Sequence, residues 1–189
     1  LPMIGARLVH KTWMSVLRLS GPEARSWLQG MVTNDVEKLA PGHGCYAGHL
    51  TPQGKLVAQM AVLAEDDGLL LLVESAAAEN LASTFDRLIV MEDVQVQNLS
   101  AAQRVLGLFG DAADGVLEKW AGAKVELTSL YAHCRVNGCL VVGHEAGCDI
   151  VVPEESVGTA ADALQAAGAA VVDRAAWNVA RVEAGIPEF

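Results

Sequence analysis

The chain has 189 residues, a hydrophobic content of 52% and a formal net charge of −10 at pH 7. This length allows one domain or two small ones with a real apolar core. The acidic charge argues against nucleic acid as a partner, because binding phosphates needs a basic face, and no apolar run approaches the roughly 20 residues of a membrane span.

The first residue is leucine, and the first eleven residues lack the charged-then-apolar order of a signal peptide. We therefore expect a native start further upstream and a cytoplasmic location. Without an export signal, the four cysteines are expected to be reduced thiols. Their spacings match no zinc-binding pattern, so no metal site is predicted. They are Cys45, Cys134, Cys139 and Cys148.

The first elements along the chain are a strand at 13–19 and a short helix. Ser20 and Glu23 have the spacing of a capping box, which predicts that Ser20 caps this helix. From Ala24, apolar residues recur at i, i+3, i+4 and i+7, the stripe of an amphipathic helix.

A hairpin follows. The sequence Thr-Pro-Gln-Gly at 51–54 suits a type I turn, which predicts strands at 45–50 and 55–63. A third strand at 69–74, a helix beginning at Ser75 and a strand at 94–99 come next. Three polar or ring-bearing side chains could gather near one end of this sheet as a floor for a flat polar ligand: Tyr46, His49 and Gln59.

Much the same order begins again after residue 103, with a hairpin about Asn137-Gly138, the strongest short hairpin signal. The sequence thus predicts two β-α-β-β-β-α-β halves, at about 13–99 and 104–172. A final helix at 174–184, capped by Asp173 and ended by Gly185, has no counterpart after the first half.

Three stretches together resemble the folate-binding portion of the glycine-cleavage T-protein (aminomethyltransferase) superfamily: TNDV at 33–36, GHGCYAGHLTPQGKLVAQM at 42–60 and RVEAGIPEF at 181–189. The sequence is most similar to the YgfZ-type branch, which is implicated in iron-sulfur cluster synthesis and repair. The resemblance implies an α+β fold for residues 1–189, in which two ferredoxin-like halves form one folate-binding unit and the C-terminal β-barrel is absent.

The same resemblance implies that Tyr46 lies beside the folate and that Glu183 hydrogen-bonds the pterin ring. A carboxylate can accept two N–H groups from an aminopyrimidine edge in a bidentate pair, which suits Glu183. The alternative is that Glu183 pairs with Arg181 or faces solvent, as most helix glutamates do. Gln59 and Arg181 are expected to line the site, and Lys55 is either a partner for the glutamate tail of a folate or a solvated lysine.

Two positions depart from the superfamily pattern. Where the enzymes carry two aspartates after the hairpin turn, this sequence has Ala58 and Gln59, neither of which can serve in acid–base chemistry. No residue is therefore expected to be a catalyst. Glu74, a further expected site residue, stands where the enzymes tend to have asparagine, and a carboxylate beside an anionic ligand needs a cation between them.

The KGCYxGQE motif of YgfZ-type proteins is absent from the sequence, and we expect the native gene to continue beyond Phe189. The predicted function is binding of tetrahydrofolate or a one-carbon derivative, in support of iron-sulfur proteins or their assembly machinery and without aminomethyl transfer. The alternatives are a tetrahydrofolate-dependent aminomethyltransferase of the glycine cleavage system and a scaffold of the same fold that binds no ligand.

Overall fold

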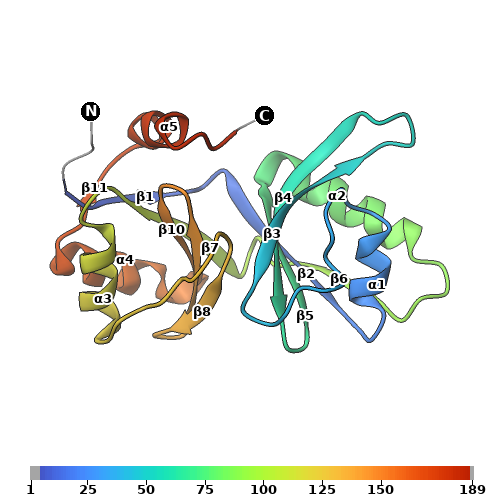
Figure 1. Cartoon of the computed structure of the whole chain (residues 1–189), viewed down its shortest axis with the longest axis horizontal. Helices are drawn as coiled ribbons and strands as arrows, with labels where there is room; N and C mark the ends of the chain where they lie inside the picture. Colours follow the sequence, from blue (N-terminus) through green and yellow to red (C-terminus); the bar gives the residue numbers. More distant parts are fainter. Residues whose placement is uncertain (1–4, 188–189) are drawn as a thin grey trace. The chain divides into compact units, whose positions relative to one another are not determined.

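A computed structural model describes residues 5–187 (Figure 1). These residues divide into two compact units. The Tyr46 unit comprises residues 12–103 and 131–133, and the Glu183 unit comprises 5–11, 104–130 and 134–187. The last two residues of the RVEAGIPEF stretch lie outside the described residues. Among residues 5–187, none of the helices has both the length and the apolar character that crossing a membrane requires.

The Tyr46 unit is an antiparallel sheet with strand order β3-β4-β5-β2-β6 and two helices. Its strands are β2 (Met14–Ser20), β3 (Gly44–Leu50), β4 (Leu56–Glu65), β5 (Gly68–Glu74) and β6 (Gln95–Asn98). Its helices are α1 (Ala24–Gln29) and α2 (Ser75–Leu88). The predicted hairpin and third strand are confirmed to within two residues at each end, and the following helix begins at Ser75 as predicted.

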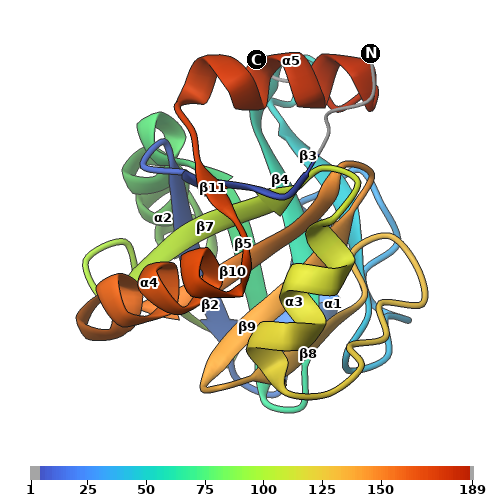
Figure 2. The same cartoon turned by 90° about the vertical axis from the view of Figure 1, so that its left-hand side faces the viewer.

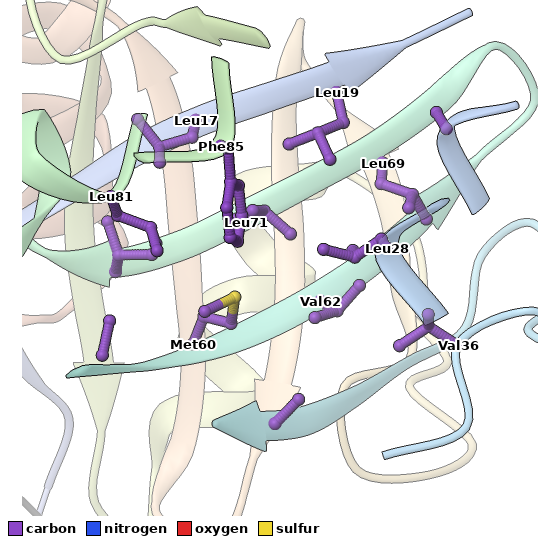
Figure 3. Close-up of a cluster of buried hydrophobic side chains, with 14 of the residues drawn as sticks. Leu17, Leu19, Leu28, Val36, Met60, Val62, Leu69, Leu71, Leu81 and Phe85 are labelled. Carbon is purple, nitrogen blue, oxygen red and sulfur yellow. The ribbon is translucent and has the colours of Figure 1, made fainter. Parts of the chain in front are cut away.

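The core of the Tyr46 unit lies between one face of this sheet and helices α1 and α2. Phe85 and Leu81 of α2 point onto the sheet beside Leu71 and Met60, and all four are buried (Figure 3). Because strand side chains alternate between faces, the residues between these core positions point to the other side of the sheet.

The Glu183 unit has a sheet with strand order β11-β1-β7-β10-β9-β8. Its strands are β1 (Arg7–His10), β7 (Gln103–Phe109), β8 (His133–Val136), β9 (Cys139–His144), β10 (Gly147–Pro153) and β11 (Ala170–Val171). The first residue of β7 and that of β8 are counted with the Tyr46 unit. Its helices are α3 (Ala113–Ala121), the 3-10 turn Glu154–Ser156, α4 (Val157–Ala167) and α5 (Arg174–Glu183). Helices α3 and α4 cover one face of this sheet, and α5 lies apart from them (Figure 2).

The predicted capping box at the first helix is wrong. Ser20 is the last residue of β2, and α1 has no side-chain cap. The Gly21 carbonyl accepts a hydrogen bond from the Ala24 amide instead, at 3.1 Å, while the Glu23 carboxylate accepts one from the Asp93 amide at 2.6 Å. A β-turn that begins at Gly21 thus replaces the cap. Only glycine fits at this position, because its φ is +108° and an added Cβ would lie 2.2 Å from the Asp93 carbonyl oxygen.

Two other local predictions are confirmed. Asn137 and Gly138 both have positive φ, 51° and 79°, as a type I′ hairpin turn between β8 and β9 requires. Asp173 caps α5, because its carboxylate accepts a hydrogen bond from the Ala176 amide at 3.0 Å. Strand β1 was not predicted from the sequence. It has only four residues and lies between β7 and β11.

Candidate functional site

Tyr46 and Gln59 meet on one face of the Tyr46 unit. In the β3–β4 register Tyr46 lies opposite Ala61 and Gly48 opposite Gln59, so the two side chains are diagonal neighbours on the same face. The Tyr46 hydroxyl donates a hydrogen bond to Oε1 of Gln59. The Tyr46 ring therefore has a fixed orientation while 37% of the residue stays exposed.

Glu74 lies on the same face. The β4–β5 register pairs Met60 with Val73, and its continuation puts Glu74 opposite Gln59. Glu74 immediately precedes α2 and is partly buried. Three of the predicted site residues thus lie on the sheet face opposite to α1 and α2.

His49 does not join them, so the predicted three-residue floor is wrong at this position. His49 is three residues from Tyr46, and an odd separation along a strand turns the side chain to the opposite face. It is 7% exposed, its Nδ1 is 2.7 Å from the Met31 carbonyl oxygen, and its ring centroid is 5.1 Å from that of Phe85. Ala58 lies opposite His49 and is buried on the same core face.

Tyr131 is a residue of this site that sequence reasoning missed. Its ring stacks on Tyr46, with centroids 6.1 Å apart and an angle of 16° between the planes. Its φ of +60° is rare for a residue with a side chain. No periodicity or motif could have placed it here, because it lies 85 residues from Tyr46 in the chain (131 − 46) and just before β8.

His133 holds Tyr131 in place. The His133 amide donates to the Gly42 carbonyl at 2.9 Å, Nε2 lies 3.0 Å from the Ala64 carbonyl oxygen and Nδ1 lies 3.1 Å from that of Tyr131. Gly44 makes room for this approach, since an added Cβ would lie 3.0 Å from Cβ of Tyr131 and 2.6 Å from the Val62 carbonyl oxygen. Together these contacts bind segment 131–133 to the β3–β4 hairpin.

The TND segment supports β3 from its outer edge. Thr33 and Gly48 exchange two hydrogen bonds of 2.9 Å, one to the Thr33 hydroxyl and one from the Thr33 amide. The side-chain amide of Asn34 donates to the carbonyl of Tyr46 at 2.9 Å. These bonds satisfy backbone groups of an edge strand and fix the backbone of Tyr46.

Lys55 lies at the tip of the hairpin and is exposed. The Gly54 amide donates to the Thr51 carbonyl at 2.8 Å, which confirms the predicted turn, and the Lys55 amide donates to the Thr51 hydroxyl at 3.2 Å.

Arg181 and Glu183 belong to α5 of the Glu183 unit. Arg181 donates to the side-chain oxygen of Asn178 at 3.0 Å and to the Ile186 carbonyl at 3.3 Å, so its guanidinium is held at the end of the helix. Glu183 is the last residue of α5 and is exposed. That Glu183 and Tyr46 meet one ligand stays a prediction.

The four cysteines are free thiols. Burial raises the pKa of the Cys148 thiol, with the charge of Asp149 adding to the effect, so Cys148 is unreactive. Within residues 5–187, no group of three or more histidine, cysteine, aspartate or glutamate side chains is arranged to hold a metal ion.

Curated proteins with similar sequences are aminomethyltransferases. The chain is 31% identical over 176 residues to an aminomethyltransferase of Desulforamulus reducens, covering 87% of this chain and 47% of that protein. It is 27% identical over 184 residues to one of Chromobacterium violaceum, covering 92% and 50%. The chain thus spans about half the length of these curated relatives.

Solved structures agree on the fold. The glycine cleavage system aminomethyltransferase T of Bartonella henselae matches with a TM-score of 0.86 and 20% identity, over 99% of this chain and 53% of that one. A heterotetrameric sarcosine oxidase of a Corynebacterium species matches with a TM-score of 0.61 and 23% identity, over 90% and 91%. The α+β class with two sheets is confirmed.

The family model of the GCVT N-terminal domain matches residues 5–189. This match agrees with the resemblance carried by the TNDV, hairpin and RVEAGIPEF stretches. The chain therefore belongs to the GCVT N-terminal domain family and represents the N-terminal portion of the T-protein superfamily.

Proposed function

We propose that this protein binds tetrahydrofolate or a one-carbon derivative. The observation that carries the proposal is the ordered Tyr46 ring, held by the Gln59 hydrogen bond and the Tyr131 stack yet still exposed. A fixed, exposed aromatic ring with polar neighbours suits a flat heterocycle, because little side-chain freedom is lost on binding. Gln59 accepts from Tyr46 through its oxygen, which leaves its amide nitrogen as a donor toward the ligand.

Glu183 accepts two N–H groups from the aminopyrimidine edge of the pterin in this proposal, and Arg181 and Glu74 line the site. Lys55 at the exposed hairpin tip contacts the glutamate tail of the folate. The support for Glu183 is its exposure at the end of α5 together with the RVEAG stretch.

We further propose a YgfZ-type role, supporting iron-sulfur proteins or their assembly in the cytoplasm without aminomethyl transfer. Ala58 and Gln59 supply no carboxylate at the position where the enzymes have two, and position 58 faces the buried core beside His49. The competing function is tetrahydrofolate-dependent aminomethyl transfer in glycine cleavage, which the names of the relatives favour.

Three experiments separate these functions. Titration with 5-formyltetrahydrofolate, a folate that resists oxidation, should give saturable heat in a calorimeter, and no binding at millimolar ligand would leave the scaffold alternative. A transfer assay with a lipoyl-bound aminomethyl donor should give no methylene-tetrahydrofolate, and turnover would establish the transferase instead. Deletion of the gene should lower the activity of iron-sulfur enzymes in the cell, with recovery on return of the intact gene.

Glu183→Gln should weaken folate binding roughly 10- to 100-fold, since a charged, two-point hydrogen bond is lost. Because Glu183 is exposed, any ion pair it makes contributes at most about 1 kcal/mol, so the thermal midpoint should change little. Glu118→Gln, at an exposed helix position of the same unit, serves as the control and should bind like the wild type. Equal affinity of Glu183→Gln and wild type would remove Glu183 from the site.

We also propose that the two units are an internal repeat. The supporting observations are the strand orders, which correspond once β1 is set aside, and two matching glycines. Gly68 and Gly147 begin β5 and β10 with φ of +156° and +150°, and an added Cβ would lie 2.3 Å and 2.2 Å from the carbonyl oxygens of Leu19 and Leu108.

A further inference from the structure

A buried charged cluster lies against α5 on the sheet face opposite to α3 and α4. Lys11, just after β1, has Nζ 2.6 Å from Oδ1 of Asp149 in β10. The same ammonium lies 3.6 Å from the ring centroid of Trp177 in α5. His144, at the end of β9, has Nε2 3.4 Å from Oδ1 of Asp149, and its ring centroid is 5.4 Å from that of Trp177.

This cluster is costly to build. Lys11, Asp149 and Trp177 are 5%, 8% and 4% exposed, and a buried ion pair recovers its desolvation cost only with excellent geometry. The contact between Lys11 and Asp149 is close but is not an aligned hydrogen bond. This geometry further limits the favourable free energy that the ion pair contributes. Stability alone therefore does not account for a lysine at this position.

The backbone makes room for the lysine. A Cβ at Gly107 in β7 would lie 2.7 Å from Cε of Lys11 and 3.5 Å from Oδ1 of Asp149. A side chain at position 107 would thus require the end of the Lys11 side chain to shift.

Trp177 is the anchor of α5. Within α5, every residue of which the structure describes, only Trp177 and Ala180 are buried. The Trp177 ring packs edge-on against Phe109, with centroids 5.3 Å apart, and offers its face to the Lys11 ammonium. A cation over an aromatic face is attracted most strongly where water is excluded, and here Asp149 fixes the position of that cation.

We propose that the Lys11–Asp149 pair positions α5 through Trp177 and thereby sets the position of the Glu183 carboxylate for ligand binding. Glu183 follows Trp177 by six residues, about 9 Å along the helix axis. The positioning residues are Lys11, Asp149 and Trp177. Only the effect on ligand binding through Glu183 rests on the proposed folate function.

The test is the double variant Lys11→Met/Asp149→Leu, which replaces both charges by apolar side chains of similar size. Such replacements are often neutral or stabilising, so the variant should fold with an unchanged or higher thermal midpoint. We expect the backbone amides of α5 to exchange hydrogen roughly tenfold faster and 5-formyltetrahydrofolate to bind roughly tenfold more weakly. The control, Lys124→Met/Glu126→Leu, removes an exposed ion pair of the same unit and should change neither.

Trp177→Leu provides the second arm, because it removes the ring and keeps the ion pair. Its α5 amides should also exchange faster, and combining it with the double variant should add little, since both changes break one contact. The proposal would be overturned if the α5 amides of the Lys11→Met/Asp149→Leu variant exchanged hydrogen at the wild-type rate. It would also be overturned if the effects of this variant and of Trp177→Leu on exchange were fully additive, or if exchange were faster while the affinity for 5-formyltetrahydrofolate stayed the same. If the wild type binds no folate, the proposed function fails, whereas the exchange data still decide whether the pair positions α5.

Discussion

Asp149→Asn should lower the free energy of unfolding by about 3–5 kcal/mol, because it leaves the ammonium of Lys11 buried without its counter-charge. Asp149 is 8% exposed and 2.6 Å from Lys11, so water cannot replace the lost partner. Urea denaturation of both proteins at pH 7 measures the difference. Glu126→Gln, which disrupts the exposed pair with Lys124, should cost less than about 1 kcal/mol.

The pKa of the Asp149 carboxyl changes on folding, and this change makes the stability of the protein depend on pH. Burial by itself raises the pKa of this carboxyl, but the charges of Lys11 and His144 outweigh burial, so the pKa is lowered on folding. The stabilisation by the ionised Asp149 carboxylate is therefore fully present above the pKa of an aspartate in the unfolded chain, about 3.9. It is lost as the pH falls toward the lower pKa of the folded state. The wild type should lose stability below about pH 4 more steeply than Asp149→Asn, and parallel curves would contradict this assignment.

Phe85→Ala should destabilise the protein by about 3–5 kcal/mol, the usual cost of deleting a large buried ring. Phe85 is fully buried and packs edge-on against Trp27 and His49, with ring centroids 5.2 Å and 5.1 Å away. The cavity cannot close easily, because the sheet on one side is fixed by hydrogen bonds. Denaturant unfolding followed by circular dichroism gives the difference.

Phe85→Leu is the matched variant, since it keeps much of the volume and should cost roughly half as much. The Phe85→Ala change should leave Tyr46 and Gln59 undisturbed, because they lie on the opposite face of the sheet. A loss below about 2 kcal/mol would mean that the core between α2 and the sheet rearranges.

Local signals in the sequence were sufficient for much of the fold. Turn chemistry at 51–54 and 137–138 predicted both hairpins, and Asp173 predicted the start of α5. The failures have local causes as well. Ser20 has the right type and spacing for a cap, but the strand continues through it and the Gly21 carbonyl takes over.

The site itself was only partly predictable. Tyr46 and Gln59 share a face, as their registers require, whereas the twofold period of a strand should have excluded His49. Tyr131 and the pairing of Lys11 with Asp149 depend on contacts between residues far apart in the chain. No periodicity or short motif encodes such contacts, so only the folded chain reveals them.

Segment 131–133 ties completion of the Tyr46 unit to a late event in synthesis. The rest of that unit ends at residue 103, yet the Gly42 carbonyl gains its donor, the His133 amide, only after a further stretch has been translated. A nascent chain halted near residue 103 should thus carry an unfinished β3–β4 ribbon with Tyr46 unstacked. The ribosome must therefore deliver residues 131–133 before residues 12–103 reach their mature form.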